Sequence, residues 1–77
     1  MRIDDDTWII IPTYNEGQMI GTVIDALMPY FSQILCVDDG SNDDSAKVAR
    51  SHGATVITHP INLGQGAALQ TGIEWVK

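Results

Sequence analysis

The chain has 77 residues, fewer than a typical domain, of which 44% are hydrophobic and 18% charged. That balance is ordinary for a globular protein and too apolar for a disordered one. Ten acidic residues against four basic ones give a formal net charge of −6, and such a surface disfavours nucleic acid and anionic lipid as partners because it repels phosphates.

Cysteine content and the start of the chain bear on its location. Cys36 is the only cysteine, which excludes an internal disulfide and a thiolate metal site. A reducing compartment fits this, so we expect a cytoplasmic protein. Residues 1–6 lack the basic region and apolar core of a signal peptide, and no apolar run reaches the roughly 20 residues of a membrane span. We interpret the three aspartates at 4–6 as a solvated tail.

The first predicted unit is a strand followed by a helix. Residues 8–11 form an apolar run rich in β-branched side chains and closed by Pro12, which predicts a strand buried on both faces. From residue 16 onward apolar residues recur at helical spacing until Pro29. Asn15 stands where the cap of this helix is expected.

The second unit repeats this order. Residues 34–37 predict another strand buried on both faces, which ends in a run of turn and capping residues at 38–43. A helix is predicted over about residues 44–52, with Gly53 as a left-handed stop.

The third unit completes the fold prediction. Residues 54–58 predict a strand, and the glycine-spaced loop 62–66 opens a last helix that is still uncapped at Lys77, so we expect a domain truncated at its C-terminal end. The alternation predicts an α/β fold: a Rossmann-like parallel three-stranded sheet with alternating helices and right-handed crossovers.

Polar clusters follow all three predicted strands, at residues 12–16, 38–41 and 59–66. In open parallel sheets ligands bind beyond the carboxyl ends of the strands, so we predict that the three loops line one pocket. The first turn has no glycine before Gly17, and Gly64-Gln65-Gly66 lacks a third glycine at the fingerprint spacing. The pattern therefore does not indicate a dinucleotide-binding fold, and a P-loop is absent.

Three motifs, in this order, resemble the signatures of family 2 glycosyltransferases of the GT-A fold. They are Pro12-Thr13-Tyr14-Asn15-Glu16, then Val37-Asp38-Asp39-Gly40-Ser41 with Asp43, then Asn62, Gly64 and Gly66. The match covers nearly the whole chain and is most similar to enzymes that move sugars from nucleotide donors to polyprenyl phosphates. The resemblance implies that residues 1–77 are the front part of a GT-A fold, a partial nucleotide-sugar-binding domain.

The resemblance also implies a nucleotide site. It places Pro12 and Tyr14 in the wall against the nucleobase, and Glu16 where a carboxylate accepts hydrogens from the ribose hydroxyls. Asp39 matches the carboxylate that accepts the imino N–H of uracil or guanine, with the Val37 backbone nearby. The residues expected to bind the nucleotide sugar are Pro12, Thr13, Tyr14, Glu16, Val37, Asp38, Asp39, Asn62, Gly64 and Gly66.

Structural roles are the alternative for the first two motifs. Tyr14 could simply pack under its loop, and Glu16 could be an acid favoured by the helix dipole. Adjacent acids point in opposite directions from a strand end, so we expect Asp39 to face the ligand and Asp38 to support the turn. In the alternative, both acids cap the next helix.

The remaining polar residues are interpreted more plainly. Gly40, Ser41 and Asp43 are mainly turn and cap residues. Asn62 and its two glycines fit either a tight turn or a place for the donor phosphate or sugar. His52 and His59 have no paired acid or thiol at ligand spacing, so we assign them no metal or catalytic role.

The chain lacks the parts of the family site that perform chemistry. Family members hold a divalent metal through an Asp-x-Asp after the next strand and use a later carboxylate as general base, and neither lies in these residues. We therefore predict no catalytic residue and no metal ligand here, and expect Mg²⁺ or Mn²⁺ only in the complete enzyme.

The expected function is transfer of a sugar from a UDP- or GDP-linked donor to a lipid-phosphate or saccharide acceptor, in cell wall or glycan biosynthesis. This chain would supply the nucleotide site only, at the inner face of a membrane in the complete protein. The alternative is a non-catalytic nucleotide-binding module. A phospho-receiver or aspartyl phosphatase is disfavoured because those place their key acids after the first strand. An unpaired edge on the first strand predicts that the fragment self-associates.

Overall fold

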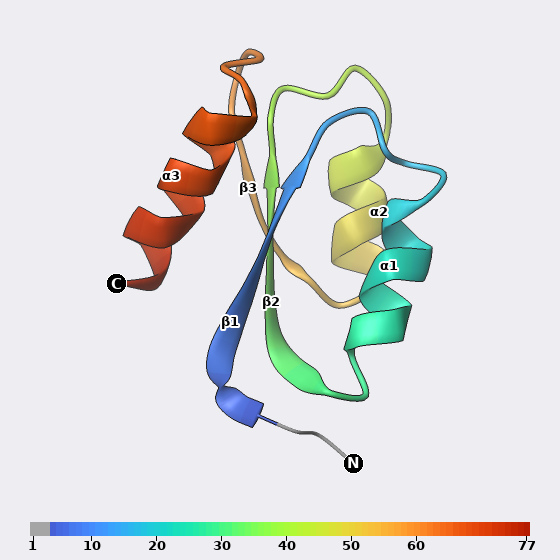
Figure 1. Cartoon of the computed structure of the whole chain (residues 1–77). Coiled ribbons are helices and arrows are strands. Elements are labelled where there is room, and N and C mark those ends of the chain that lie inside the picture. Colours follow the sequence, from blue (N-terminus) through green and yellow to red (C-terminus); the bar gives the residue numbers. More distant parts are fainter. Residues whose placement is uncertain (1–3) are drawn as a thin grey trace.

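The computed structural model describes residues 4–77, and our expectations about residues 1–3 lie outside this part. Its strands are β1 (Asp4–Thr13), β2 (Phe31–Asp38) and β3 (Thr55–Thr58), and its helices are α1 (Ile20–Leu27), α2 (Ser45–Ser51) and α3 (Gln65–Val76). The strands are all parallel in the order β1-β2-β3, so the predicted α/β fold is confirmed (Figure 1). No helix in this part of the chain is long and apolar enough to cross a membrane.

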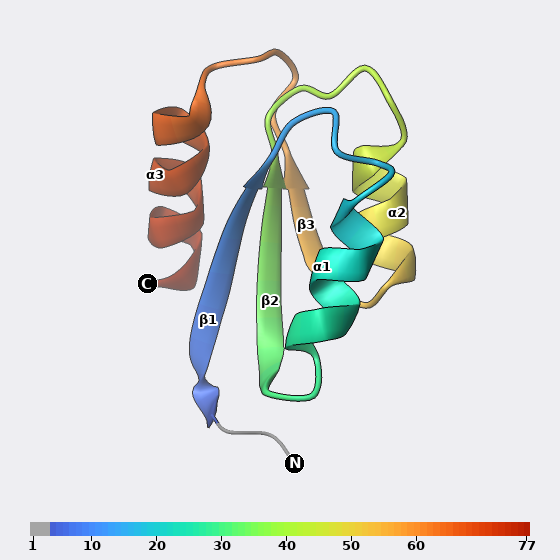
Figure 2. The same cartoon turned by 45° about the vertical axis from the view of Figure 1, so that its right-hand side comes forward.

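The sheet lies between two layers of helices, with α1 and α2 over one face and α3 over the other (Figure 2). Ile34 and Cys36 of β2 belong to the core under α1 and α2. Leu35 and Val37 point the other way, into the core under α3. All four side chains are at most 2% exposed, so this strand is buried on both faces as predicted.

Strand β1 differs from its prediction in length and in burial. It starts at Asp4, which pairs with Phe31 before a shift of register, so residues 4–6 belong to a strand and are not a tail. Residues 8–11 are half-buried rather than buried on both faces. The reason is position: β1 lies at one edge of the described sheet, where fewer neighbours cover it.

Helix α1 begins four residues later than predicted. The N–H groups of Met19 and Ile20 both donate to the Glu16 carbonyl, which closes a tight turn before the helix. Asn15 adopts a left-handed conformation with φ 51° and does not cap α1. Its side-chain oxygen instead accepts a hydrogen bond from the Asn42 N–H. This contact with another loop replaces the expected bond to the start of the helix.

The other boundaries move by a few residues. Strand β2 is longer at both ends than predicted, while α2 and β3 are each shorter by one or two residues. Gly53 has φ 99° and its N–H donates to the Arg50 carbonyl, so the predicted left-handed stop is confirmed. These differences leave the carboxyl ends of the three strands at one edge of the sheet (Figure 1).

Candidate functional site

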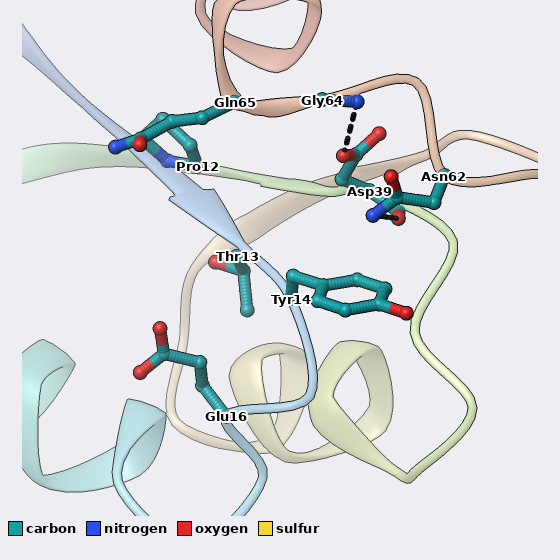
Figure 3. A pocket seen from close by; sticks show the side chains of 8 residues that line it. All are labelled: Pro12, Thr13, Tyr14, Glu16, Asp39, Asn62, Gly64 and Gln65. Atoms are coloured by element: carbon teal, nitrogen blue, oxygen red, sulfur yellow. Dashed lines mark hydrogen bonds between the residues drawn. The ribbon is translucent and has the colours of Figure 1, made fainter.

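A pocket of about 440 Å³ opens at this edge, and the loops after all three strands contribute to it. The prediction that three loops line one pocket is confirmed. Figure 3 shows the side chains around it. The lining residues are Pro12, Thr13, Tyr14, Glu16, Asp39, Asn62, Gly64 and Gln65.

Most of the residues expected to bind nucleotide meet here, but not all of them do. Val37 is wholly buried in the core beside Ala68, Asp38 is the buried last residue of β2, and Gly66 is not part of the lining. Gln65 lines the pocket and was not predicted. Its only signal in the sequence was its place between two glycines. Whether the lining residues bind nucleotide stays a prediction.

The loop after β1 presents one buried and two exposed side chains. Thr13 is 2% exposed and its hydroxyl donates to the Ile11 carbonyl at 3.1 Å, which fixes the end of the strand. Tyr14 is 43% exposed, so its ring does not pack under the loop. Figure 3 shows Tyr14 and Glu16 extending from this loop. The aromatic face and the carboxylate are therefore both accessible.

Backbone and side chains tie this loop to the one after β2. The Asn15 N–H donates to the Ser41 hydroxyl at 2.8 Å, and the Asn42 N–H donates to the Asn15 side chain at 2.8 Å. The two bonds run in opposite directions between the same pair of loops. They fix the entry to the pocket on the Tyr14 side.

A second tie runs through Ser45, the first residue of α2. The Glu16 N–H donates to the Ser45 hydroxyl at 2.8 Å, and that hydroxyl donates to the Asp43 carboxylate. Asp43 also accepts the Ser45 N–H at 2.9 Å and the Gly17 N–H at 3.1 Å. The Ser45 hydroxyl and then the Ser45 N–H lower the pKa of Asp43. The N-cap of α2 is Asp44, without a side-chain cap bond, so Asp43 is not the N-cap residue; it accepts the N–H of the first residue of α2 from one position earlier and holds the backbone of Gly17 directly and that of Glu16 through Ser45.

Asp38 and Asp39 point in different directions, as expected for adjacent residues. Asp38 accepts the Ser41 N–H at 3.2 Å and the Ser41 hydroxyl, so it supports the turn. Asp39 instead accepts the N–H groups of Leu63 at 2.9 Å and Gly64 at 2.8 Å, across the pocket edge (Figure 3). Asp38 and Asp39 therefore hold two different loops, and the alternative in which both cap α2 is wrong.

Asp39 is held in its ionised form. Its side chain is 4% exposed, and its hydrogen bond with His59 and then the Leu63 N–H lower its pKa. Hydrogen bonds to a carboxylate stabilise the charged state more than burial destabilises it here. Near neutral pH the pocket therefore contains a fixed negative charge.

His59 is the residue that sequence reasoning missed. It is 8% exposed, with Nδ1 2.8 Å from the Asp39 carboxylate and Nε2 2.8 Å from the Thr71 hydroxyl. His52, the C-cap of α2, also has an acidic partner, Asp25 of α1 at 2.8 Å. The expectation that neither histidine has a paired acid is wrong, because both acids are distant in sequence and come close only through the fold.

Close backbone contact between two loops completes the pocket. Gly40 has φ 72°, and a Cβ built there would lie 2.5 Å from the Ile61 carbonyl carbon and 2.6 Å from the Asn62 nitrogen. Only glycine fits both the conformation and the space. At the same contact the Asn62 side-chain amide donates to the Asp39 backbone carbonyl at 3.3 Å. This bond attaches the loop after β3 to the loop after β2.

The sequence model described as glycosyl transferase family 2 matches residues 8–77. The chain belongs to this family. The match begins at Trp8 of β1 and includes every residue of the pocket.

Relatives of family 2 in several organisms resemble the chain. The uncharacterized protein MJ1222 of Methanocaldococcus jannaschii is 38% identical over 71 residues, which are 91% of this chain and 29% of that protein. A dolichyl-phosphate hexose transferase of Haloferax volcanii is 38% identical over 72 residues, or 90% of this chain and 31% of that protein. The chain thus spans less than a third of the length of these relatives.

Solved family 2 structures share the fold. Glucosyl-3-phosphoglycerate synthase from Mycobacterium tuberculosis, solved in complex with uridine diphosphate, superposes with a TM-score of 0.76 at 28% identity. The superposition covers 86% of this chain and 28% of that one. Another structure of the same enzyme contains Mn²⁺, UDP-glucose and phosphoglyceric acid. The expected GT-A fold is therefore confirmed.

The residues present do not supply a metal site. Within residues 4–77, no three His, Cys, Asp or Glu side chains lie close enough together to hold an ion. The carboxylates of Asp39 and Asp43 are already engaged by backbone and side-chain donors of this chain.

Proposed function

We propose that the protein is a glycosyltransferase that uses a UDP- or GDP-linked sugar, and that this chain holds the nucleotide of the donor. One observation carries the proposal. The pocket at the carboxyl ends of three parallel strands combines an ionised carboxylate, Asp39, with an exposed aromatic ring, Tyr14, and the carboxylate of Glu16. A nucleoside presents the three matching groups: a polar base edge, a flat apolar face and a pair of hydroxyls.

Each side chain has one assigned task. The Tyr14 ring packs against the face of the base, which aromatic side chains do well. The Glu16 carboxylate accepts hydrogen bonds from the ribose hydroxyls. Asp39 accepts the imino N–H of the base. Uracil and guanine carry such a proton whereas cytosine and adenine do not, which favours UDP or GDP.

The comparisons support the donor class and leave the acceptor to the proposal. The Mycobacterium enzyme is known in complex with UDP and with UDP-glucose, and the Haloferax relative is named for transfer to dolichyl phosphate. We assign a lipid-phosphate or saccharide acceptor, and a cytoplasmic location at the inner face of a membrane. Mg²⁺ or Mn²⁺ belongs to the proposed enzyme through residues outside 4–77, since these residues do not form a site for it.

Calorimetry with UDP, GDP and CDP tests the nucleotide site. UDP or GDP should bind, and Asp39→Ala should weaken that binding by about tenfold or more, since a hydrogen bond to a charged group is lost. Asp25→Ala serves as the matched control. It removes a different carboxylate, on α1 and outside the pocket, that also pairs with a histidine, His52. Absence of UDP and GDP binding would overturn the proposal.

Transfer is tested separately, in protein that contains whatever follows these residues in its gene. Release of UDP or GDP from the sugar nucleotide in the presence of a polyprenyl phosphate or an oligosaccharide would support the enzyme. Nucleotide binding without any transfer would favour the non-catalytic nucleotide-binding module instead. The 77 residues alone should bind and not turn over, because the family resemblance places the general base and the Asp-x-Asp later in the sequence.

Self-association is part of the proposal for the 77-residue chain in isolation. β1 lies at an edge of the described sheet, and an exposed strand edge is a template for pairing with another chain. Light scattering at micromolar concentration should give a mass above 8.4 kDa. A monomeric mass would contradict this part.

A further inference from the structure

His59 connects the pocket to Thr71 of α3. It follows β3 directly, is 8% exposed, and uses both ring nitrogens: Nδ1 lies 2.8 Å from Asp39 Oδ1, and Nε2 lies 2.8 Å from Thr71 Oγ1. It does not line the pocket itself. Its contact with a ligand must therefore pass through Asp39.

The hydrogen-bond partners define the tautomer. An ionised carboxylate can only accept, so His59 Nδ1 carries the proton and donates it to Asp39. In the neutral ring Nε2 is then an acceptor, and the Thr71 hydroxyl donates to it. The imidazole is fixed at both ends and cannot turn without breaking one bond.

The same bonds leave one acceptor direction of Asp39 open. A carboxylate offers about four lone-pair directions. Oδ1 takes two donors, His59 Nδ1 and the Leu63 N–H, and Oδ2 takes one, the Gly64 N–H. Among the described residues, 4–77, the fourth direction, on Oδ2, is the one not used. Because Asp39 lines the pocket, that lone pair is the one a ligand can reach.

We propose that His59 is a positioning residue, which holds the Asp39 carboxylate so that the free lone pair of Oδ2 faces the base and selects bases with an imino N–H. This rests on the proposed nucleotide site. Without the His59 bond, Oδ1 keeps only the Leu63 N–H and Oδ2 keeps the Gly64 N–H, so the carboxylate is held less firmly against rotation about its Cβ–Cγ bond. The free lone pair of Oδ2 then no longer points in one fixed direction toward the base. The preference for uracil or guanine over cytosine should fall as a result.

Two isosteric variants separate the bond to Asp39 from the bond to Thr71. The amide nitrogen of Asn lies near the place of Nδ1, and that of Gln near the place of Nε2. His59→Asn should keep the donor to Asp39 and bind UDP or GDP within about threefold of the wild type. His59→Gln should weaken that binding by about tenfold, because the donor to a charged acceptor is gone. It should also reduce the ratio of the affinity for UDP or GDP to the affinity for CDP. Thr71→Val also loses only the bond to Nε2 and should bind like His59→Asn.

A ligand-free readout accompanies the binding data. Nitrogen NMR of the wild type should find His59 protonated on Nδ1. Carbon NMR should show a higher pKa for Asp39 in His59→Gln than in His59→Asn. His52→Gln breaks the similar 2.8 Å pair with Asp25 outside the pocket and should leave Asp39 unchanged.

The outcomes are distinct. Equal effects of His59→Asn and His59→Gln on Asp39 and on the preference over CDP would overturn the proposal, as would a His59 ring without a proton on Nδ1. If the wild type binds neither UDP nor GDP, the proposed function and the base preference both fail. The Asp39 titration still decides in that case whether His59 positions the carboxylate.

Discussion

Trp8 of β1 and Trp75 of α3 meet edge to face, with ring centroids 4.9 Å apart and ring planes at 82°. Trp8 is half-buried and Trp75 is 46% exposed. Helix α3 also contacts the sheet through the buried small residues Ala68 and Gly72 and through the partly buried Val76. The indole pair is therefore the main aromatic contact that fixes the last turns of α3 against the edge strand.

Replacing Trp75 should loosen that end of the helix. An edge-to-face pair contributes about 0.5–1.5 kcal/mol beyond the apolar area it buries. We expect Trp75→Ala to lower the free energy of unfolding by at least that amount in urea denaturation followed by circular dichroism. Trp75→Phe keeps an aromatic edge and should recover part of the loss. Identical stability of the wild type and the alanine variant would show that the contact does not stabilise the fold.

Gly40→Ala should disrupt the contact between two pocket loops. Its backbone has φ 72°, and the added Cβ would meet the backbone of Ile61 and Asn62 at 2.5–2.6 Å. A residue forced into such a conformation costs about 1–3 kcal/mol, before any loop displacement. We expect a lower urea midpoint and loss of UDP or GDP binding together.

Gly66→Ala is the matched control for that substitution. It lies in the first turn of α3 with no atom within 4 Å of an added Cβ. Alanine in an open helical position stabilises by about 0.4–1 kcal/mol. A loss of stability as large as that of Gly40→Ala would contradict the explanation by backbone contact.

Stability should fall on acidification through two carboxylates. Hydrogen bonds hold the pKa values of Asp39 and Asp43 below 3.8 in the folded chain. The unfolded chain then binds more protons at low pH, so the stability they contribute is complete above about pH 5 and declines as pH falls through the folded-state pKa values. Urea midpoints measured between neutral pH and pH 2 should show this decline. Asp43→Asn should flatten it, and an unchanged slope would contradict the assignment.

Cys36 should resist thiol reagents while the chain is folded. Burial raises its pKa to about 11, opposed by a hydrogen bond with Thr13 and assisted by the charge of Asp38. Near pH 8 this lowers the thiolate fraction by about a hundredfold, and the wholly buried sulfur is also shielded. A chromogenic disulfide should label one thiol per chain in urea and almost none without it. Rapid labelling of the native chain would show that β2 opens.

Several parts of the fold could be predicted because their causes are local. All four residues of the run 34–37 are apolar, so both faces of this strand are favoured to be buried. Gly53 ends a helix because glycine readily adopts a left-handed conformation. Alternation of three such strands with helices leaves the parallel sheet as the simple solution. The polar clusters after the strands then had to meet at one edge, which brought Tyr14, Glu16 and Asp39 together in one pocket.

The predictions that failed concern features that depend on partners far along the chain. Asn15 satisfies the rules for a helix cap, yet its side chain binds Asn42, which only the neighbouring loop could provide. Burial of residues 8–11 depends on how many strands flank β1, a property of the sheet and not of the run.

By itself, the sequence determined the α/β order, the motifs of family 2 and the edge of the sheet at which a ligand should bind, since each follows from spacing or from residues adjacent in the chain. Only the tertiary structure decided the state of the site. Asp39 and His59 are 20 positions apart, and their bond exists because β2 and β3 are parallel neighbours whose carboxyl ends coincide. Hydrogen bonds across such a distance depend on register and rotamer, which no local pattern encodes.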